Sequence, residues 1–252
     1  MVLPVIGWIL YSDDALLAVN KPAGLPALPD GYNPDMPHIK ALLEPDFGRL
    51  WIVHRLDRQT SGLMLLPRTP HAHRSLNDQF QSHQVSKTYH ALIAGDPLWD
   101  ETTIDLPLRP DGDRRHRTIV DQSCGKPALT GLRLLERFGQ FSLVEAAPQT
   151  GRTHQLRAHL SAVGFPILCD SLYGGGQRLV TVHQPVESDG LDATQNSLLE
   201  RMGLHAWSLE FQHPESRAHV RLVAPYPPDF ERTLEFLRRF PDSTVELVSK
   251  SR

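Results

Sequence analysis

The chain has 252 residues, a formal net charge of −3 and an ordinary globular composition, with 40% hydrophobic and 22% charged residues. This length suits one large domain or two small ones with a substantial core. The near-neutral charge argues against a non-specific nucleic-acid coat protein, although it allows a local basic face. No apolar run approaches the roughly 20 residues that span a bilayer, so we expect no membrane segment.

The N-terminal residues lack the basic region and small-residue cleavage site of a signal peptide. The two cysteines, Cys124 and Cys169, follow no metal-binding or redox spacing. We therefore expect a cytoplasmic protein with inert thiols. The histidines match no zinc-ligand motif, so no metal is expected.

The charges are unevenly distributed along the chain. The segment between Arg49 and His90 contains six Arg or Lys residues and two acidic residues. The segment from Pro185 to the C-terminus contains eleven acidic and eight basic residues. Two interpretations stay open, namely statistical scatter and a basic active-site face with an acidic back.

The first expected elements are two strands joined by a polar turn, over residues 9–11 and 16–19. The segment Asn-Lys-Pro-Ala-Gly at residues 20–24 is expected to end the second strand. Residues 22–37 are rich in Pro, Gly and Asp and indicate a surface loop. A short helix is expected over residues 38–43.

The next region is expected to form a strand, a loop and a strand, with the strands at residues 50–53 and 63–66. Thr69 and Pro70 then open a helix, because a capping hydroxyl followed by proline is typical of a helix start. Residues 87–94 alternate between polar and apolar side chains and predict a further strand.

The second half of the chain predicts two hairpins, one over residues 128–137 and 141–147 and one over residues 204–211 and 219–223. Because short turns join the strands and few helices intervene, the sequence predicts an α+β fold. Its sheet is expected to be mixed and largely antiparallel, with flanking helices.

Two helices are expected in this half. Thr153 is the expected cap of the first, which Gly164 closes, and Asp229 is the expected cap of the last. Residues 174–201 are polar and aperiodic, which indicates a long excursion or mobile loop. Their glycine run lacks the lysine of a phosphate loop, so no nucleotide cofactor is expected.

The most informative motif is residues 54–63, which place Asp57 among two arginines, a histidine and two hydroxyls. A carboxylate that stays ionised and fixed meets the needs of a nucleophile or a proton-abstracting base. A tight turn over residues 60–62 is expected to leave it exposed at a strand end. The alternative is a structural salt bridge with Arg55 or Arg58.

A hydrolase triad of Ser61, His54 and Asp57 is a weak alternative. The three residues lie close together in the sequence, and no Gly-x-Ser-x-Gly nucleophile elbow surrounds the serine.

Three further segments carry candidate side chains. Arg152 lies at the mouth of the expected helix and could clamp a carboxylate bidentately, unless it belongs to a solvated helix start. Tyr89 either packs in the core or stacks on an unstacked base. The basic loop over residues 114–117 is either solvated or contacts phosphates.

Taken together and in this order, the motifs resemble those of the RluA-type pseudouridine synthases. The matching segments are Asn20–Gly24, His54–Gly62, Lys87–Tyr89, Gly125–Ala128, Thr150–His159, Gly164–Gly174 and Leu204–Ala206. The resemblance runs from about Ile9 to about Pro225 and so covers nearly the whole chain.

The resemblance implies the pseudouridine synthase fold in a single catalytic domain over residues 1–252. The core is expected over about 9–225 and a C-terminal extension over 227–252. Many relatives carry a small N-terminal RNA-binding domain of the S4 type. Only eight residues precede Ile9, so we expect no separate RNA-binding domain.

The resemblance also implies roles for individual residues. Asp57 would be the catalytic aspartate, Arg152 its salt-bridge partner and Tyr89 the ring beneath the target base. Leu204 would be an apolar wall of the uracil pocket, and Arg55 would enter the RNA where the base has left. Further uracil or RNA contacts are expected from His54, Arg58, Gln155, Arg114, Arg115, Arg117 and Lys126.

The implied reaction breaks the bond between uracil N1 and ribose, turns the ring and rejoins it through carbon 5. It consumes nothing, so no cofactor is expected, and the uridine must first leave its stack. The sequence leaves open whether Asp57 attacks a carbon or takes a sugar proton.

The expected substrate is transfer RNA or ribosomal RNA. The expected protein is a monomer without an obligate protein partner. The competing hypothesis is a non-catalytic RNA-binding or RNA-folding factor on the same scaffold.

Overall fold

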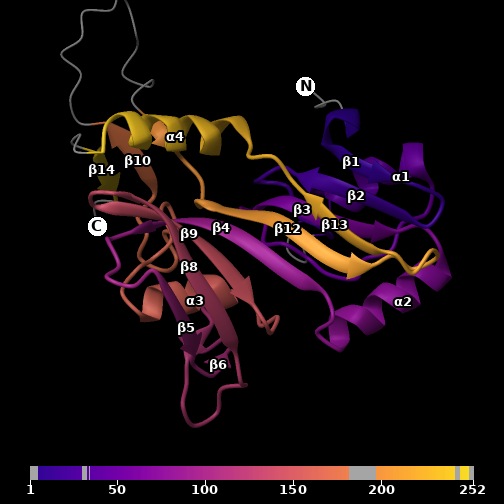
Figure 1. The fold of residues 1–252 in the computed structure, drawn as a ribbon, viewed down its shortest axis with the longest axis horizontal. Coiled ribbons are helices and arrows are strands. Elements are labelled where there is room, and N and C mark those ends of the chain that lie inside the picture. Colours follow the sequence, from indigo (N-terminus) through magenta and orange to yellow (C-terminus); the bar gives the residue numbers. More distant parts are fainter. Residues whose placement is uncertain (1–4, 30–32, 34, 182–196, 242–244, 250–252) are drawn as a thin grey trace, which may run out of the picture. The chain divides into compact units, whose positions relative to one another are not determined.

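The structure is a computed structural model (Figure 1). It describes residues 5–29, 33, 35–181, 197–241 and 245–249. The chain divides into two compact units. The first comprises Met1–Tyr89 and His205–Tyr226, and the second comprises His90–Leu204 and Pro227–Arg252. The prediction of a single catalytic domain stays a prediction.

The first unit is built on one sheet, in the order β1-β2-β3-β12 with β13 paired to β12. The strands are β1 (Ile9–Ser12), β2 (Leu16–Lys21), β3 (Ser61–Pro67), β12 (Leu204–Gln212) and β13 (His219–Val223). The pair β3 and β12 is parallel, whereas β1–β2, β2–β3 and β12–β13 are antiparallel. The two strands expected at the N-terminus and the hairpin expected over residues 204–223 are thereby confirmed.

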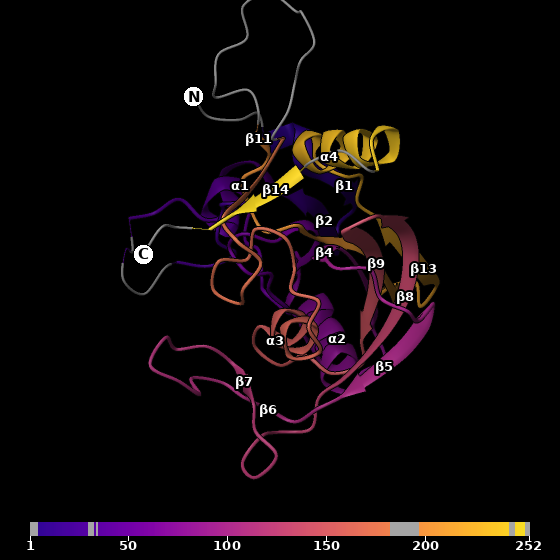
Figure 2. The same ribbon diagram turned by 90° about the vertical axis from the view of Figure 1, so that its left-hand side faces the viewer.

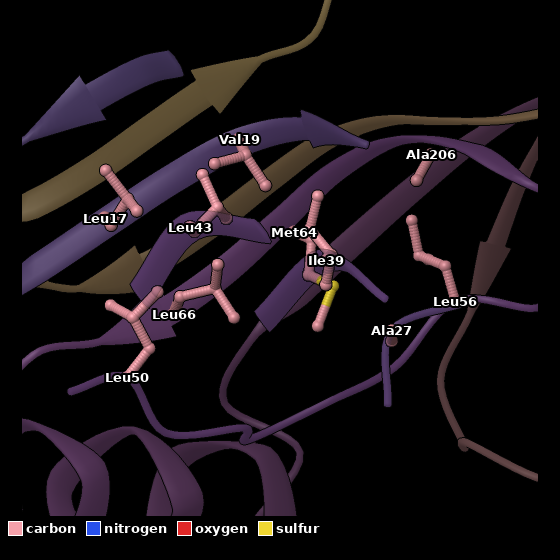
Figure 3. Close-up of a cluster of buried hydrophobic side chains, with 10 residues drawn as sticks. All are labelled: Leu17, Val19, Ala27, Ile39, Leu43, Leu50, Leu56, Met64, Leu66 and Ala206. Carbon is pink, nitrogen blue, oxygen red and sulfur yellow. The ribbon is translucent and has the colours of Figure 1, made fainter. Parts of the chain in front are cut away.

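Both faces of this sheet are covered, which is why every residue of β3 is buried. On one face, drawn in Figure 3, alternate residues of β2 and β3 pack against α1 (Ile39–Phe47). On the other face, the intervening residues pack against Leu76 of α2 (Pro70–Gln81). The period of two along each strand therefore divides the apolar side chains between two cores.

The two helices of this unit begin at side-chain caps. The Nδ1 atom of His38 accepts the backbone N–H of Ala41, and α1 then continues to Phe47, beyond its expected end. The Thr69 hydroxyl accepts the backbone N–H of Ala72 at 3.0 Å, and proline follows as the first helical residue. The predicted start of α2 is confirmed.

The second unit contains a sheet in the order β4-β9-β8-β5. Its strands are β4 (Ser86–Ala94), which begins in the first unit, β9 (Phe141–Pro148), β8 (Leu129–Phe138) and β5 (Glu101–Asp105). Strands β8 and β9 pair antiparallel around a two-residue turn at Gly139 and Gln140. The expected strand over residues 87–94 and the expected hairpin over residues 128–147 are confirmed.

Two smaller sheets complete this unit. A two-stranded hairpin joins β6 (Leu108–Arg109) to β7 (Ile119–Val120). A second sheet has the order β11-β10-β14, with β10 (Arg178–Thr181), β11 (Ser197–Leu199) and β14 (Val245–Val248). Figure 2 shows α3 (Gln155–Ala162) beside the β9-β8-β5 sheet and the β6–β7 hairpin below it. The sequence predicted none of β5, β6, β7, β10, β11 and β14.

Both N-terminal helix caps predicted for the second unit are wrong, whereas Gly164 follows the end of α3 as predicted. Helix α3 begins one residue later than expected, after His154 in a left-handed conformation with φ of 51°, and no side chain caps it. Helix α4 (Pro228–Arg239) follows Pro227. Asp229 does not cap it, because the helix begins at Pro228 and Asp229 lies inside the first turn. There its carboxylate binds Arg201 at 2.6 and 2.9 Å and accepts the Phe230 backbone N–H at 2.8 Å.

The C-terminal extension contributes structure to the second unit. The Thr233 hydroxyl of α4 donates to the Leu198 carbonyl of β11, and β14 pairs with β10. Strands β10 and β11 lie inside the excursion expected over residues 174–201, whose residues 182–196 fall outside the described part of the chain. In the described part, none of the helices has the length and apolar character to cross a membrane.

Candidate active site and RNA interface

Asp57 lies half-buried in the loop that leads directly into β3. Its neighbour Leu56 is only 7% exposed and belongs to the hydrophobic cluster that includes Ala206 (Figure 3). After Asp57 the chain turns, because the backbone N–H of Thr60 donates to the Asp57 carbonyl at 3.0 Å. A buried anchor on one side and a hydrogen-bonded turn on the other hold the position of the carboxylate.

The strand expected before this loop, over residues 50–53, is wrong, since the structure places no strand there. Side-chain stacking holds the segment instead. The Trp51 ring stacks on His73 with centroids 6.3 Å apart, and His54 stacks on Phe80 at 4.6 Å. Positions 73 and 80 are seven residues apart in α2, about two helical turns. The loop therefore runs along one flank of α2.

His54 completes the backbone hydrogen bonding of β3. Its Nε2 atom accepts the backbone N–H of Leu65 at 2.9 Å. Burial, and to a lesser extent the charge of Lys87, lowers the pKa of His54 to about 3. The imidazole is therefore neutral near pH 7 and acts as a structural acceptor. Its predicted contact with RNA stays a prediction.

We expect His54 to make the fold sensitive to acid. Because the pKa of His54 is lower in the folded than in the unfolded chain, the unfolded chain takes up the proton first as the pH falls. This contribution is complete above about pH 6.5 and is lost towards pH 3, with about 1–2 kcal/mol gone by pH 5. Denaturant titrations at pH 5 to 8 measure it.

His54→Gln should flatten this pH dependence, because the variant has no imidazole to protonate. The matched control is His71→Gln, which alters an exposed histidine of α2 and should keep the wild-type dependence. An unchanged pH dependence in His54→Gln would contradict the assignment.

A buried lysine ties the Asn20–Gly24 motif to the loop of Asp57. The side chain of Lys21 is fully buried, and its ammonium donates to the carbonyls of Pro22, Leu25 and Arg58 at 2.8, 2.9 and 3.3 Å. Gly24 donates its N–H to the Arg58 carbonyl and accepts the Arg58 Nε–H. The Asn20–Gly24 motif and the loop of Asp57 are therefore joined by hydrogen bonds, several of which involve Arg58. The RNA contact predicted for Arg58 stays a prediction.

The predicted tight turn over residues 60–62 is also wrong, because Ser61 and Gly62 open β3. Both are fixed by β12. The buried Ser61 hydroxyl bonds to Nδ1 of His205 at 2.9 Å, so it is a structural group rather than a nucleophile. Gly62 has φ of +113°, and a Cβ there would lie 2.3 Å from the Ala206 carbonyl oxygen. Only glycine permits this approach of the two strands.

Tyr89 packs against the same cluster that holds Leu56. Burial, and secondarily the charge of Asp57, raises the pKa of the Tyr89 phenol far above its usual value. The phenol therefore stays protonated near pH 7. Asp57 and Tyr89 both belong to the first unit. Arg55, beside Asp57 in the sequence, is exposed.

Arg152 lies in the second unit, where both its backbone and its side chain donate hydrogen bonds. Its N–H donates to the Gln155 side-chain oxygen at 3.0 Å, and its Nε–H donates to the Pro127 carbonyl at 3.0 Å. The Gln155 side chain is 4% exposed and also bonds to Leu129 and Thr130. These contacts give Gln155 a structural role, and its predicted contact with uracil or RNA gains no support from them.

The remaining predicted residues of the second unit differ in exposure. Leu204 is buried at the start of β12. Arg114, Arg115 and Lys126 are exposed, whereas Arg117 is half-buried and pairs with an aspartate of its own loop. The basic segment is a loop between the strands of the β6–β7 hairpin.

The predicted catalytic residues are distributed over both units. Asp57 and Tyr89 belong to the first unit with Arg55, and Arg152 belongs to the second. The pairing of Arg152 with Asp57 therefore stays a prediction. Among the described residues, no group of three or more His, Cys, Asp or Glu side chains could hold a metal ion.

Sequence reasoning missed the structural roles of several motif residues. The sequence places Lys21 at a strand end, and its position between a buried strand and a proline is the signal that could have indicated a buried ammonium. Asp170, which is 3% exposed, binds Arg157 through both oxygens at 2.7 and 2.9 Å. No signal in the sequence pairs these two residues, because the contact joins a helix to a later turn.

Comparisons with known proteins decide the family. The model of a family described as RNA pseudouridylate synthase matches residues 15–162. Ribosomal large subunit pseudouridine synthase D of Xanthomonas campestris is 37% identical over 248 residues, which are 96% of this chain and 72% of that protein. This chain belongs to the RNA pseudouridine synthase family. The resemblance predicted from the motifs is confirmed.

Further comparisons agree with this assignment. The synthase D of Pseudomonas aeruginosa is 38% identical over 236 residues, which are 92% of this chain and 72% of that protein. The solved structure of human RNA pseudouridylate synthase domain containing 4 has a TM-score of 0.71 and 25% identity. That match covers 97% of this synthase and 96% of the human chain. The predicted α+β fold is confirmed, and the protein is an isomerase that acts on RNA.

Proposed function

We propose that this synthase converts uridines of large-subunit ribosomal RNA into pseudouridine. The relatives from Xanthomonas and Pseudomonas are named for the ribosomal large subunit, which favours this RNA over transfer RNA. Asp57 is the catalytic carboxylate of the proposal, Arg152 its partner and Tyr89 the ring beneath the uracil. The observation that carries the catalytic assignment is geometric: the loop of Asp57 is anchored by Leu56 and by the turn at Thr60, and Tyr89 packs against the same cluster as Leu56.

The chemistry needs few groups from the protein. The N1–C1′ bond breaks, the ring turns, a bond forms between C5 and C1′, and the C5 proton leaves while N1 gains one. A carboxylate at the ribose–base junction acts on the sugar or the ring. A neutral phenol ring offers a stacking surface for the extruded base.

The substrate is tested with RNA from a strain that lacks this gene. Purified protein is incubated with large-subunit ribosomal RNA or with transfer RNA, and carbodiimide labelling locates pseudouridine. We expect new labelled positions in ribosomal RNA only. Labelling confined to transfer RNA would overturn the proposed substrate, and no labelling of either would favour the non-catalytic RNA-binding factor.

We expect Arg114→Ala to weaken RNA affinity by roughly 3- to 10-fold and to reduce the slope of log K against log salt by about 0.7–1. Arg114 is exposed at the end of the β6–β7 hairpin, where a phosphate can reach it. Filter binding at several salt concentrations measures both quantities. The control is Arg221→Ala on β13, an exposed arginine paired with Glu210, which should change neither.

The remaining expectations concern the state of the protein in the cell. A monomeric state, the absence of an obligate protein partner and a cytoplasmic location stay predictions.

A further inference from the structure

Two of the four arginines between residues 109 and 121 of the β6–β7 hairpin are paired with aspartates. Arg109 pairs with Asp121 at 2.6 Å and Arg117 with Asp113 at 2.7 Å. The carboxylate of Asp111 accepts a hydrogen bond from Nδ1 of His116, in the same loop. No ion pair is found for Arg114 among the described residues, so its charge is available to an anion.

Asp113 also orders the backbone of this loop. Its Oδ1 atom accepts the N–H groups of Arg115 and Arg117 at 3.0 and 3.1 Å. Two backbone donors are thus satisfied by one carboxylate, which is how aspartate stabilises a turn. The side chain of Arg114 therefore starts from an ordered turn.

Tyr173 fixes the hairpin from outside. Its hydroxyl oxygen accepts the backbone N–H of Thr118 at 2.8 Å and lies 3.1 Å from Nδ1 of His154, which precedes α3. Its ring lies under the Arg157 guanidinium at 4.8 Å. Burial raises the pKa of the phenol, so the hydroxyl keeps its proton near pH 7. One hydroxyl thus joins the hairpin to the start of α3.

The turn that carries Tyr173 makes two more contacts with the hairpin. Arg115 donates to the Ser171 carbonyl at 3.2 Å, and Arg117 donates to the Leu172 carbonyl at 3.3 Å. The turn is itself fixed by the bidentate pair of Asp170 with α3. The side chains of Arg115 and Arg117 therefore donate to backbone carbonyls of this turn.

We propose that Tyr173 is a positioning residue that holds the β6–β7 hairpin in the orientation in which Arg114 meets the RNA. Arg117 belongs to this anchor and does not contact RNA. A fixed hairpin loses less conformational entropy when RNA binds, and so binds RNA more tightly than a free one. The proposal rests on the RNA contact proposed for Arg114.

Tyr173→Phe is the direct test, because it removes only the hydroxyl. We expect KM for RNA to rise roughly 3- to 10-fold, as the loss of one hydrogen bond predicts, while kcat changes less than about 2-fold. Amide hydrogen exchange at Thr118 should become faster. An unchanged KM, or an unchanged exchange rate at Thr118, would overturn the positioning role.

The matched control is Tyr11→Phe, which removes a hydroxyl that donates to Asp13 at 2.8 Å in the first unit. It should leave KM for RNA unchanged. An equal rise of KM in both variants would show a general loss of stability and would overturn the proposal.

A double-mutant cycle separates this proposal from the proposed function. If Tyr173 acts through Arg114, Arg114→Ala should weaken RNA binding less in Tyr173→Phe than in the wild type. Full additivity would overturn the positioning role. If Arg114→Ala alone has no effect on affinity, its proposed RNA contact fails, and exchange at Thr118 still decides whether Tyr173 anchors the hairpin.

Discussion

Replacing Asp57 by Asn is expected to reduce turnover by roughly 10³-fold or more, because an amide is neither a nucleophile nor a base. The side chain keeps its shape, and Leu56 and the turn at Thr60 still hold the loop. RNA affinity should therefore change little. Single-turnover assays with labelled RNA measure the rate, and filter binding measures the affinity.

The matched control for this variant is Asp13→Asn, since Asp13 is also a half-buried loop carboxylate of the first unit. It accepts hydrogen bonds from Tyr11 and from the backbone of Ala15 and Leu16. This variant should lose stability but keep its turnover per folded molecule. Turnover near the wild-type rate in Asp57→Asn would refute the catalytic assignment.

Arg152→Met is expected to lower kcat by roughly 10²- to 10³-fold, as the proposed pairing with the catalytic carboxylate implies. Methionine keeps much of the apolar stem of the side chain but removes every donor. The loop should survive, because the Arg152 backbone N–H still bonds to Gln155. Rapid-quench kinetics with saturating RNA measures kcat apart from binding.

Two further variants sharpen this result. Arg152→Lys keeps the charge without the bidentate fork and should recover only part of the rate. Arg133→Met removes an exposed arginine of the same unit that pairs with Glu145 at 3.1 Å. It should leave kcat unchanged. A wild-type kcat in Arg152→Met would remove Arg152 from the active site.

The strands that the sequence did predict, β1 to β4, β8, β9, β12 and β13, were predictable because their signals are local. The strands of β2, β8, β9 and β12 follow from apolar alternation bounded by turn residues. Thr69 followed by proline predicts α2, since cap and first turn are adjacent in the chain. The predicted caps at Thr153 and Asp229 fail because α3 begins after His154 and α4 begins at Pro228, before Asp229. The carboxylate of Asp229 also binds Arg201, which lies 28 positions away, and no local pattern shows this contact.

At the candidate site, too, local motifs were predictable from the sequence and contacts between distant residues were not. Motif order alone pointed to Asp57, Tyr89 and Arg152. It did not show that Lys21 also binds the Arg58 carbonyl, because Arg58 lies 37 positions away in the loop of Asp57.

The sequence by itself therefore determined the family, the α+β class and the segment that carries the candidate carboxylate. Only the tertiary structure decided which motif residues are structural partners, such as Ser61 with His205, and which basic side chains stay exposed, such as Arg114. The physical reason is that periodicity and capping depend on neighbours within a few positions. Burial and hydrogen bonding across strands and loops depend on residues that the fold brings together from far apart in the chain.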